Sequence, residues 1–215
     1  KRFIKSGSKV YFTDLRPKKY SFKHKNLISI KCDMTKLSQI NKLKRILKKE
    51  KKIDILVNNV GDAIKRSSFL ESNDKLWKDS LDLNLMSAVR TTRTVLEMLK
   101  KSKNGVIINV SSVASRIGGS GDSLHYGVAK AGLNVFTTGL ARELKSIRVL
   151  GIAPSAVDTD FQKRHSSKAR LQKVINATPM GRIASAKEIA DLVYFLSSSK
   201  ASYVSGDTIF ITGGR

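Results

Sequence analysis

The sequence G-V-I-I-N-V-S-S-V-A-S-R-I-G-G-S-G-D-S-L-H-Y-G-V-A-K, residues 105–130, decides the fold of this chain. It begins with an apolar run at 106–110 that only Asn109 interrupts, a pattern typical of a parallel strand covered on both faces. Two serines follow the run, then a glycine-rich loop, and the pattern predicts a helix from about Ser123. We therefore expect a parallel sheet with polar groups at the carboxyl end of this strand.

Tyr126 and Lys130 are four residues apart, so on a helix they share one face. A free phenol titrates near ~10 and is a poor base at neutral pH, but a neighbouring cation lowers its pKa. The hydroxyl of Ser111 or Ser112, after the strand, could hold a carbonyl oxygen beside that phenol. The alternative is that Tyr126 only packs, with its hydroxyl in water, because such a pair often occurs by chance. The rest of the chain has to decide between the two interpretations.

Length and composition suit one α/β domain over residues 1–215. No apolar run approaches the ~20 residues of a membrane span, and no secretory signal pattern is visible. The single cysteine, Cys32, excludes an internal disulfide framework and fits a reducing, cytoplasmic location. Because Cys32 lies in an apolar run, we expect a buried, inert thiol.

The formal net charge of +24 is the unusual feature of the composition. Such a charge attracts polyanions and could steer an acidic partner to the protein. The lysines, however, are dispersed over the surfaces of predicted helices, and the sequence has no zinc-ligand spacing and no aromatic-basic RNA motif. The composition therefore favours neither a specific nucleic-acid-binding protein nor a metal site.

The remaining elements alternate between strands and helices. The patterns predict the end of a helix at 1–7, strands at 10–13, 26–31, 53–57, 147–153 and 208–211, and helices at 37–47, 77–86, 123–144 and 186–197. Residues 160–180 are polar and suited to a mobile lid. This alternation predicts a doubly wound parallel sheet that binds ligands at the carboxyl ends of its strands.

Polar residues follow several of these strands. Asp14 could accept both hydroxyls of an adenosine ribose and would repel a 2′-phosphate, or it could merely cap a turn. Arg16 could instead accommodate that phosphate. Gly61, in the run N-N-V-G at 58–61, allows close approach to a ligand. Asn84 lies amid leucines in a helix, so we expect it to have a specific partner.

In this order, the motifs resemble those of the short-chain dehydrogenase/reductase family over nearly the whole chain. The matching pieces are N-N-V-G at 58–61, Asn84, I-N-V-S-S at 108–112, Y-x-x-x-K at 126–130, P-S-x-x-x-T at 154–159, M-G-R-I at 180–183 and Y-V-S-G-D at 203–207. The chain is most similar in general character to 3-oxoacyl-(acyl-carrier-protein) reductases and related alcohol or sugar dehydrogenases.

The resemblance implies a Rossmann-like oxidoreductase that moves a hydride between a nicotinamide cofactor and a carbonyl or secondary alcohol. Its catalytic tetrad would be Asn84, Ser112, Tyr126 and Lys130, with Ser112 rather than Ser111 at the family position. Tyr126 would exchange a proton with the substrate oxygen, and Lys130 would lower the tyrosine pKa and bind the nicotinamide ribose. Asn84 would hold a water that relays protons.

The resemblance also implies a cofactor, a substrate class and an assembly. The matching cofactor positions are Asp14, Asp33, Met34, Asn59, Gly61, Tyr126, Lys130, Val157 and Thr159. We expect NAD, with NADP as the alternative, and no metal. The substrate is a small carbonyl compound or alcohol, with an anionic or carrier-bound form as one option. A homodimer or homotetramer would pair through the helix that starts near Tyr126.

The chain departs from the family pattern in three respects. Val60 replaces a usual alanine and Ser155 a usual glycine, which crowds the cofactor. The family's first strand and its T-G-x-x-x-G-x-G turn, which hold the pyrophosphate, have no counterpart in these 215 residues. We therefore expect an amino-terminally truncated domain whose sheet lacks a central strand and which binds dinucleotide weakly. The alternative function is a catalytically silent relative that serves as a binding or assembly subunit.

Overall fold

The computed structural model describes residues 1–17 and 22–215. The strands are β1 (Val10–Asp14), β2 (Leu27–Lys31), β3 (Ile55–Asn58), β4 (Gly105–Val110), β5 (Ile147–Pro154), β6 (Val157–Asp158), β7 (Ala184–Ser185) and β8 (Thr208–Ile211). The helices are α1 (Arg2–Lys5), α2 (Leu37–Leu47), α3 (Asp74–Leu81), the π-helix η2 (Asp82–Met86), α4 (Ser87–Leu99), α5 (Ala114–Ile117), α6 (Leu124–Glu143), α7 (Asp160–His165), α8 (Lys168–Asn176), α9 (Ala186–Ser197) and the 3₁₀ helix η3 (Ser199–Ala201).

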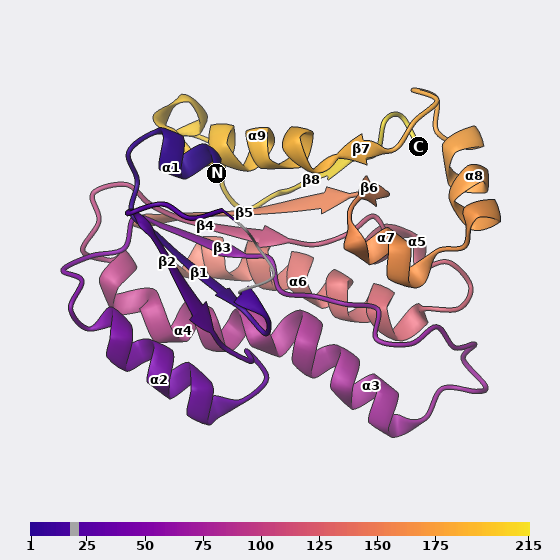
Figure 1. Cartoon of the computed structure of the whole chain (residues 1–215), viewed down its shortest axis with the longest axis horizontal. Coiled ribbons are helices and arrows are strands. Elements are labelled where there is room, and N and C mark those ends of the chain that lie inside the picture. Colours follow the sequence, from indigo (N-terminus) through magenta and orange to yellow (C-terminus); the bar gives the residue numbers. More distant parts are fainter. Residues whose placement is uncertain (18–21) are drawn as a thin grey trace.

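The fold is a parallel sheet between two layers of helices, as expected. Strands β3, β4, β5 and β8 form one parallel sheet in the order β3-β4-β5-β8. Figure 1 shows α1 and α9 on one face of this sheet and α3, α4 and α6 on the other. Neighbouring residues of β4 face opposite layers, because Ile107 packs into one hydrophobic cluster and Val106 and Ile108 into the other. This burial on both faces explains the continuous apolar run from which the fold was predicted.

Strands β1 and β2 form a separate parallel pair. Among the described residues, β1 pairs only with β2, and β3 pairs only with β4. The expected gap between the second and fourth strands of the family order is therefore confirmed, since β1–β2 and β3–β4–β5–β8 are separate sheets. The short strands β6 and β7 pair in a third sheet. Packing of α2 and α4 through Ile40, Leu43 and Val95 joins both sheets to one hydrophobic cluster.

The segment 160–180 contains helices α7 and α8, and its expected role as a mobile lid stays a prediction. Two other local features differ from what the sequence pattern suggests. The helix expected at 77–86 changes into the π-helix η2 around Asn84. Leu37 follows the apolar spacing of Ile40, Leu43 and Leu47 in the sequence, but it lies at the first position of α2 with 62% of its surface exposed. The other predicted strands and helices are confirmed to within a few residues.

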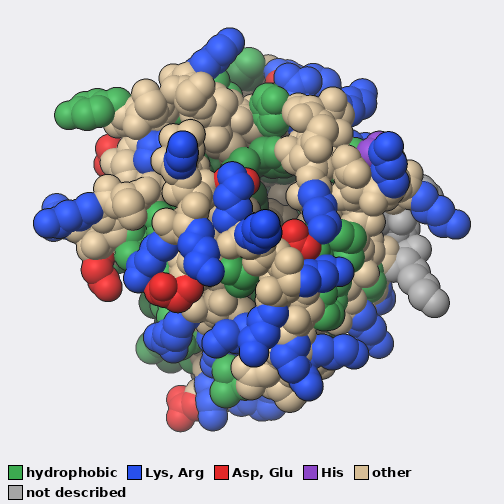
Figure 2. Space-filling view, turned by 90° about the vertical axis from the view of Figure 1, so that its left-hand side faces the viewer, with side chains coloured by type: hydrophobic (Ala, Val, Ile, Leu, Met, Phe, Trp, Pro, Cys, Tyr) green, Lys and Arg blue, Asp and Glu red, His purple; other side chains and the backbone are tan. Residues whose placement is uncertain are grey.

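Basic side chains are dispersed over the surface, as the sequence suggests. Figure 2 shows lysine and arginine side chains spread over one whole face of the molecule, with few acidic side chains between them. Cys32 is buried, as expected, and burial raises the pKa of its thiol. Within residues 1–17 and 22–215, no helix combines the length and the apolar character needed to cross a bilayer.

Candidate active site

Gly61, Asn84 and Lys130 meet just beyond the carboxyl ends of β3 and β4. A Cβ atom on Gly61 would lie 2.8 Å from Asn84 Oδ1 and 2.9 Å from Lys130 Nζ, both closer than ordinary contact. Glycine is therefore required here by two neighbouring side chains of the protein itself. The expectation that Gly61 also allows the close approach of a ligand stays a prediction.

Asn84 is fully buried and has the specific partners that a polar side chain in a helix requires. Its Oδ1 accepts a hydrogen bond of 3.0 Å from the backbone N–H of Asp62, and its Nδ2 donates to the carbonyl of Asp62 at 2.9 Å. Nδ2 also donates to the carbonyl of Ser80 at 3.0 Å. Asn84 thus fixes the backbone that follows β3, and its role toward a relay water stays a prediction.

The two serines after β4 have different partners. Ser111 is buried, and its hydroxyl donates a hydrogen bond of 3.0 Å to the backbone carbonyl of Lys130. The Ser112 hydroxyl accepts a hydrogen bond of 3.2 Å from the N–H of Ala114 and lies close enough to the Tyr126 hydroxyl to lower the pKa of that phenol. The structure therefore brings together Ser112 and Tyr126, the pair that the resemblance implied, and gives Ser111 a structural partner.

Burial dominates the titration of Tyr126. It raises the pKa of the phenol to about 12, against the lowering effect of the Ser112 hydroxyl. The negative charge of Asp62 raises this pKa further. Burial of the phenol thus outweighs the lowering effect, which in this structure comes from Ser112. The expectation that Lys130 lowers the pKa of Tyr126 during the reaction stays a prediction.

Lys130 is a buried cation beside the tyrosine. Its Nζ lies 5.8 Å from the centre of the Tyr126 ring and donates a hydrogen bond of 2.8 Å to the carbonyl of Val110. Burial lowers the pKa of this ammonium to about 8. In the described part of the chain, one of its three N–H donors is used in a hydrogen bond. This cation is therefore suited to contact hydroxyl groups of a ligand.

A chain of buried polar side chains joins the strands beneath the site. Asn58 donates hydrogen bonds to Thr92 Oγ1 at 3.1 Å and to Asn109 Oδ1 at 2.9 Å. Asn109 in turn donates to Thr137 Oγ1 at 2.9 Å on α6. The asparagine that interrupts the apolar run of β4 thus ties this strand to β3 and to the helix that carries Tyr126 and Lys130.

The predicted adenosine-binding residues lie at or just after the ends of β1 and β2, and this pair of strands is not hydrogen-bonded to β3 or β4. Asp14 ends β1, and its Oδ1 accepts a hydrogen bond of 2.6 Å from the backbone N–H of Arg16. Asp33 accepts hydrogen bonds from the N–H and hydroxyl of Thr35 at 2.9 and 2.7 Å. Met34 is buried in the hydrophobic core, so its side chain is a core residue and does not line an open site.

The other predicted cofactor residues lie closer to the tetrad. Asn59 follows β3 and is exposed, whereas Val60 packs against the core. Val157 belongs to β6, and the Thr159 hydroxyl donates to its carbonyl at 3.2 Å. The Ser155 hydroxyl is buried and has no partner among the described residues.

Asp62 is a residue of the site that the sequence analysis missed. Its carboxylate accepts a hydrogen bond of 2.8 Å from the N–H of Ile64 and lies 2.7 Å from Arg164 Nη1 and 2.6 Å from His165 Nε2. It therefore connects the loop after β3, and through Asn84 the tetrad, to helix α7. An acidic residue next to Gly61 was visible in the sequence, but its partners lie a hundred residues away.

Among the described residues, no group of three or more His, Cys, Asp or Glu side chains could hold a metal ion.

Comparisons with known proteins agree with this geometry. A family model described as enoyl-(acyl carrier protein) reductase matches residues 1–215. The 3-oxoacyl-[acyl-carrier-protein] reductase of Escherichia coli strain K12 is 38% identical over 165 residues, which are 75% of this chain and 66% of that protein. The chain thus spans slightly less than two thirds of this curated relative.

Two solved structures are similar over 99% of this chain. One is the short-chain dehydrogenase/reductase described as a glucose/ribitol dehydrogenase from Brucella melitensis, with 27% identity, 88% of that chain covered and a TM-score of 0.90. The other is the ligand-free aldohexose dehydrogenase of Thermoplasma acidophilum, with 25% identity, 86% of that chain covered and a TM-score of 0.88.

Proposed function

The chain belongs to the short-chain dehydrogenase/reductase family, and from this premise we propose that it interconverts a carbonyl compound and a secondary alcohol. The observation that carries the proposal is the cluster of Ser112, Tyr126 and Lys130, in which a phenol and a buried ammonium share one face of α6. A nicotinamide cofactor, when bound, supplies or accepts the hydride of this reaction.

The residues of this chain fit the nicotinamide end of such a cofactor. Lys130 is a buried cation with donors left for ribose hydroxyls, and burying it without a ligand is costly, as its lowered pKa of about 8 indicates. Asn59, Val157 and Thr159 are the further residues that would hold this end, and Asp14 and Asp33 would hold the adenosine end. The carboxylate of Asp14 favours NAD over NADP, since it would repel a 2′-phosphate.

Proton transfer is the task of the tetrad in this proposal. The Ser112 hydroxyl and the Tyr126 hydroxyl would both contact the substrate oxygen, and Tyr126 would give its proton to that oxygen during reduction. Because the pKa of Tyr126 is about 12, the phenol is protonated at neutral pH and ready to act as an acid. Asn84 positions this arrangement by fixing the backbone at Asp62.

We propose the substrate class from the names of similar proteins. The E. coli relative is named as a reductase of 3-oxoacyl groups on acyl carrier protein, and the two structural relatives as sugar dehydrogenases. We take 3-oxoacyl thioesters as the first substrate class to test and aldoses as the second. The cytoplasmic location expected from the single cysteine stays a prediction.

The test is the absorbance of NADH and NADPH at fixed protein concentration with a 3-oxoacyl thioester, followed by the reverse reaction with aldoses. The proposal would be supported if the wild type oxidises the reduced nucleotide and Tyr126→Phe does not. If wild type and Tyr126→Phe gave the same rate with every substrate, the oxidoreductase proposal would be wrong.

A second candidate is a catalytically silent binding subunit. One observation favours it: in the described chain, the inner edges of β1 and β3 are unpaired, so no single sheet holds both ends of the cofactor site. Under this proposal, neither NADH nor NADPH would be oxidised with any substrate at any concentration tested, and Tyr126→Phe would leave binding of a protein partner unchanged.

A further inference from the structure

A basic pocket opens beside the tetrad, between the loop after β3 and the connection from α7 to α8. Its volume is about 470 Å³. It is lined by Ile64, Lys65, Arg66, Arg164, His165, Ser166 and Ser167. Three of these side chains are permanent cations, and none is acidic. A pocket of this size is within the range that binds small molecules or parts of them.

Aromatic rings place this pocket next to Tyr126. The Phe161 ring lies 6.1 Å from the Tyr126 ring and 4.8 Å from the ring of His165, which lines the pocket. On the other side, Nε2 of His125 lies 3.1 Å from the carbonyl of Lys65. A substrate whose reacting carbon is at Tyr126 could therefore extend past Phe161 into the pocket.

The walls of the pocket are held by side chains with defined partners. Arg66 donates a hydrogen bond of 2.6 Å from Nε to the His165 carbonyl and another of 2.7 Å to Asp122. Arg164 is paired with Asp62 at 2.7 Å. These contacts connect α7 to the loop after β3 and to the glycine-rich loop, so the pocket has a preformed shape.

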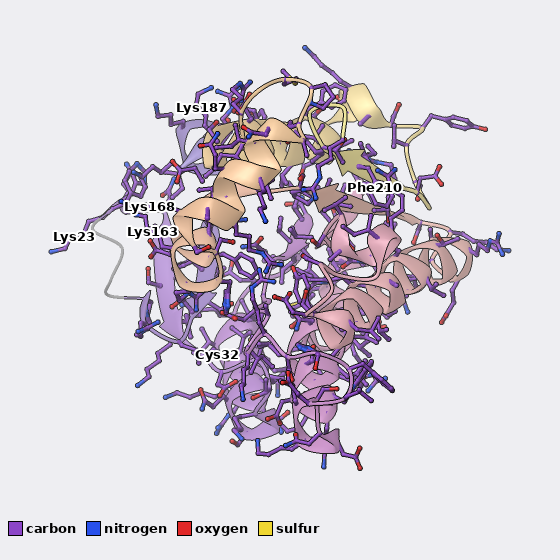
Figure 3. The ribbon with its side chains drawn as sticks, turned by 90° about the vertical axis from the view of Figure 1, so that its right-hand side faces the viewer. Lys23, Cys32, Lys163, Lys168, Lys187 and Phe210 are labelled. Carbon is purple, nitrogen blue, oxygen red and sulfur yellow. The ribbon has the colours of Figure 1, made fainter. Side chains whose placement is uncertain are left out.

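Cations outnumber carboxylates around the pocket. Asp122 is shared between Arg66 and Arg170, and Asp62 is shared between Arg164 and His165. Lys65 has no ion pair within salt-bridge distance in the described chain. The pKa of Glu71 is lowered chiefly by its hydrogen bonds with Ser68 and only to a lesser extent by the charge of Lys65. Figure 3 shows two more lysines, Lys163 and Lys168, beside α7 and α8.

The start of α8 adds to the positive potential. Ser166 and Ser167 line the pocket, and the Ser167 hydroxyl caps the helix by accepting a hydrogen bond of 3.2 Å from the N–H of Arg170. The amino end of a helix carries a partial positive charge that favours anions. This contribution has the same sign as the three cationic side chains of the lining.

We propose that this pocket binds an anionic group, a phosphate or a carboxylate, that the substrate carries away from its reacting carbon. The inference rests on the proposed function, because it names the substrate class of the same site. Arg164 is the side chain best placed to change partner, since it is about half exposed (52%) and could turn from Asp62 to a ligand without unfolding the lid. Lys65 would supply the second charge.

The experiment is a calorimetric titration of the whole chain with inorganic phosphate and, separately, with acetate, at constant ionic strength. The pocket variant is Lys65→Gln/Arg164→Gln, and the matched control is Lys42→Gln/Arg45→Gln, which removes the same charge from the exposed face of α2. We expect the Kd for the anion to rise about five-fold or more in the pocket variant and less than about two-fold in the control, as is typical for losing partly exposed charge contacts. Circular dichroism checks that both variants are folded.

The two anions distinguish the possible sources of the charge. A response to phosphate alone would assign a phosphorylated or phosphodiester-linked substrate, and a response to acetate would assign an oxo acid. Equal Kd values in the pocket variant and the control, or no saturable binding of either anion by the wild type, would overturn the proposal. Lys65→Gln alone leaves the contacts of the lid intact and should show a smaller shift in the same direction. The titration measures no turnover, so absence of anion binding would leave the proposed redox function standing. Conversely, a chain that binds phosphate but shows no turnover would contradict only the proposed redox function.

Discussion

The ammonium nitrogen of Lys130 lies 5.8 Å from the centre of the Tyr126 ring, in a position where only 3% of the lysine is exposed. Its hydrogen bond goes to a neutral group, the carbonyl of Val110. A buried cation with a neutral partner costs folding free energy, which is why burial lowers its pKa to about 8. Lys130 is thus placed where its charge destabilises the fold.

We predict that Lys130→Met raises the melting temperature at pH 7 while removing activity. The pKa of the ammonium is about 8 in the folded state and 10.5 for an ordinary lysine, as in the unfolded chain, so between these values the unfolded chain binds more protons. The stability of the wild type therefore rises with pH in this window, and the full cost is present below pH 8. After the lost hydrogen bond to Val110 is allowed for, the gain at pH 7 should be on the order of 2 kcal/mol.

Thermal unfolding of both proteins from pH 7 to pH 10 checks this prediction. The difference in stability between variant and wild type should shrink as pH rises and the wild-type lysine loses its proton. Lys42→Met, at an exposed position of α2, is the control and should change stability little at any pH. A difference for Lys130→Met that stayed constant up to pH 10 would contradict the argument.

We predict that Tyr126→Phe lowers kcat by about 10²–10⁴-fold, the usual contribution of a general acid, and leaves the Kd for dinucleotide nearly unchanged. Only the proton-donating oxygen is removed, and the ring keeps its contact with Phe161. Tyr203→Phe is the matched control, because Tyr203 is fully exposed and far from the tetrad in sequence. If Tyr126→Phe retained more than a few per cent of wild-type turnover, Tyr126 would not be the acid.

The cofactor preference can be tested at Asp14. We expect kcat/KM to be higher with NADH than with NADPH, because the carboxylate would repel a 2′-phosphate, and Asp14→Ser should narrow that ratio. The backbone N–H of Arg16 already binds Asp14 Oδ1 and fixes the carboxylate at the end of β1. A wild-type preference of tenfold or more for NADPH would instead favour Arg16 as the residue that selects the cofactor, and Arg16→Ala should then abolish it.

The parts of the structure that follow from local pattern were predictable from the sequence. The apolar run of β4, the spacing of Tyr126 and Lys130 and the buried Cys32 each depend on neighbouring residues, and the structure confirms their placement. The choice of Ser112 over Ser111 came from resemblance alone. The structure adds its physical reason, since Ser111 is bonded to the backbone of Lys130.

The features that depend on distant contacts could not be predicted. The pairing of Asp62 with Arg164 joins two charged segments whose sequences give no indication of each other. The polar composition of residues 160–180 suits a mobile lid, but it does not reveal that Arg66 and Asp122, from other loops, contact helices α7 and α8. The high pKa of Tyr126 was also missed, because the separation of two residues on a helix says nothing about how deeply they are buried.

The exposed apolar face of α6 leads to the last prediction, a homo-oligomer. Val128 and Val135 are 42% and 73% exposed and lie seven residues apart, so they share one side of the helix, whereas Leu133 faces the core. Pairing of this side with the same side of a second copy would bury both valines in a two-fold symmetric contact.

We expect the wild type to sediment as a dimer or tetramer at micromolar concentration. Val135→Lys should shift it toward the monomer, because the contact would then bring two like charges together across the symmetry axis. The control is Met180→Lys, because Met180 is 62% exposed and does not belong to α6. This substitution should leave the assembly intact. A wild type that sediments as a monomer would mean that the valines of α6 are simply solvated.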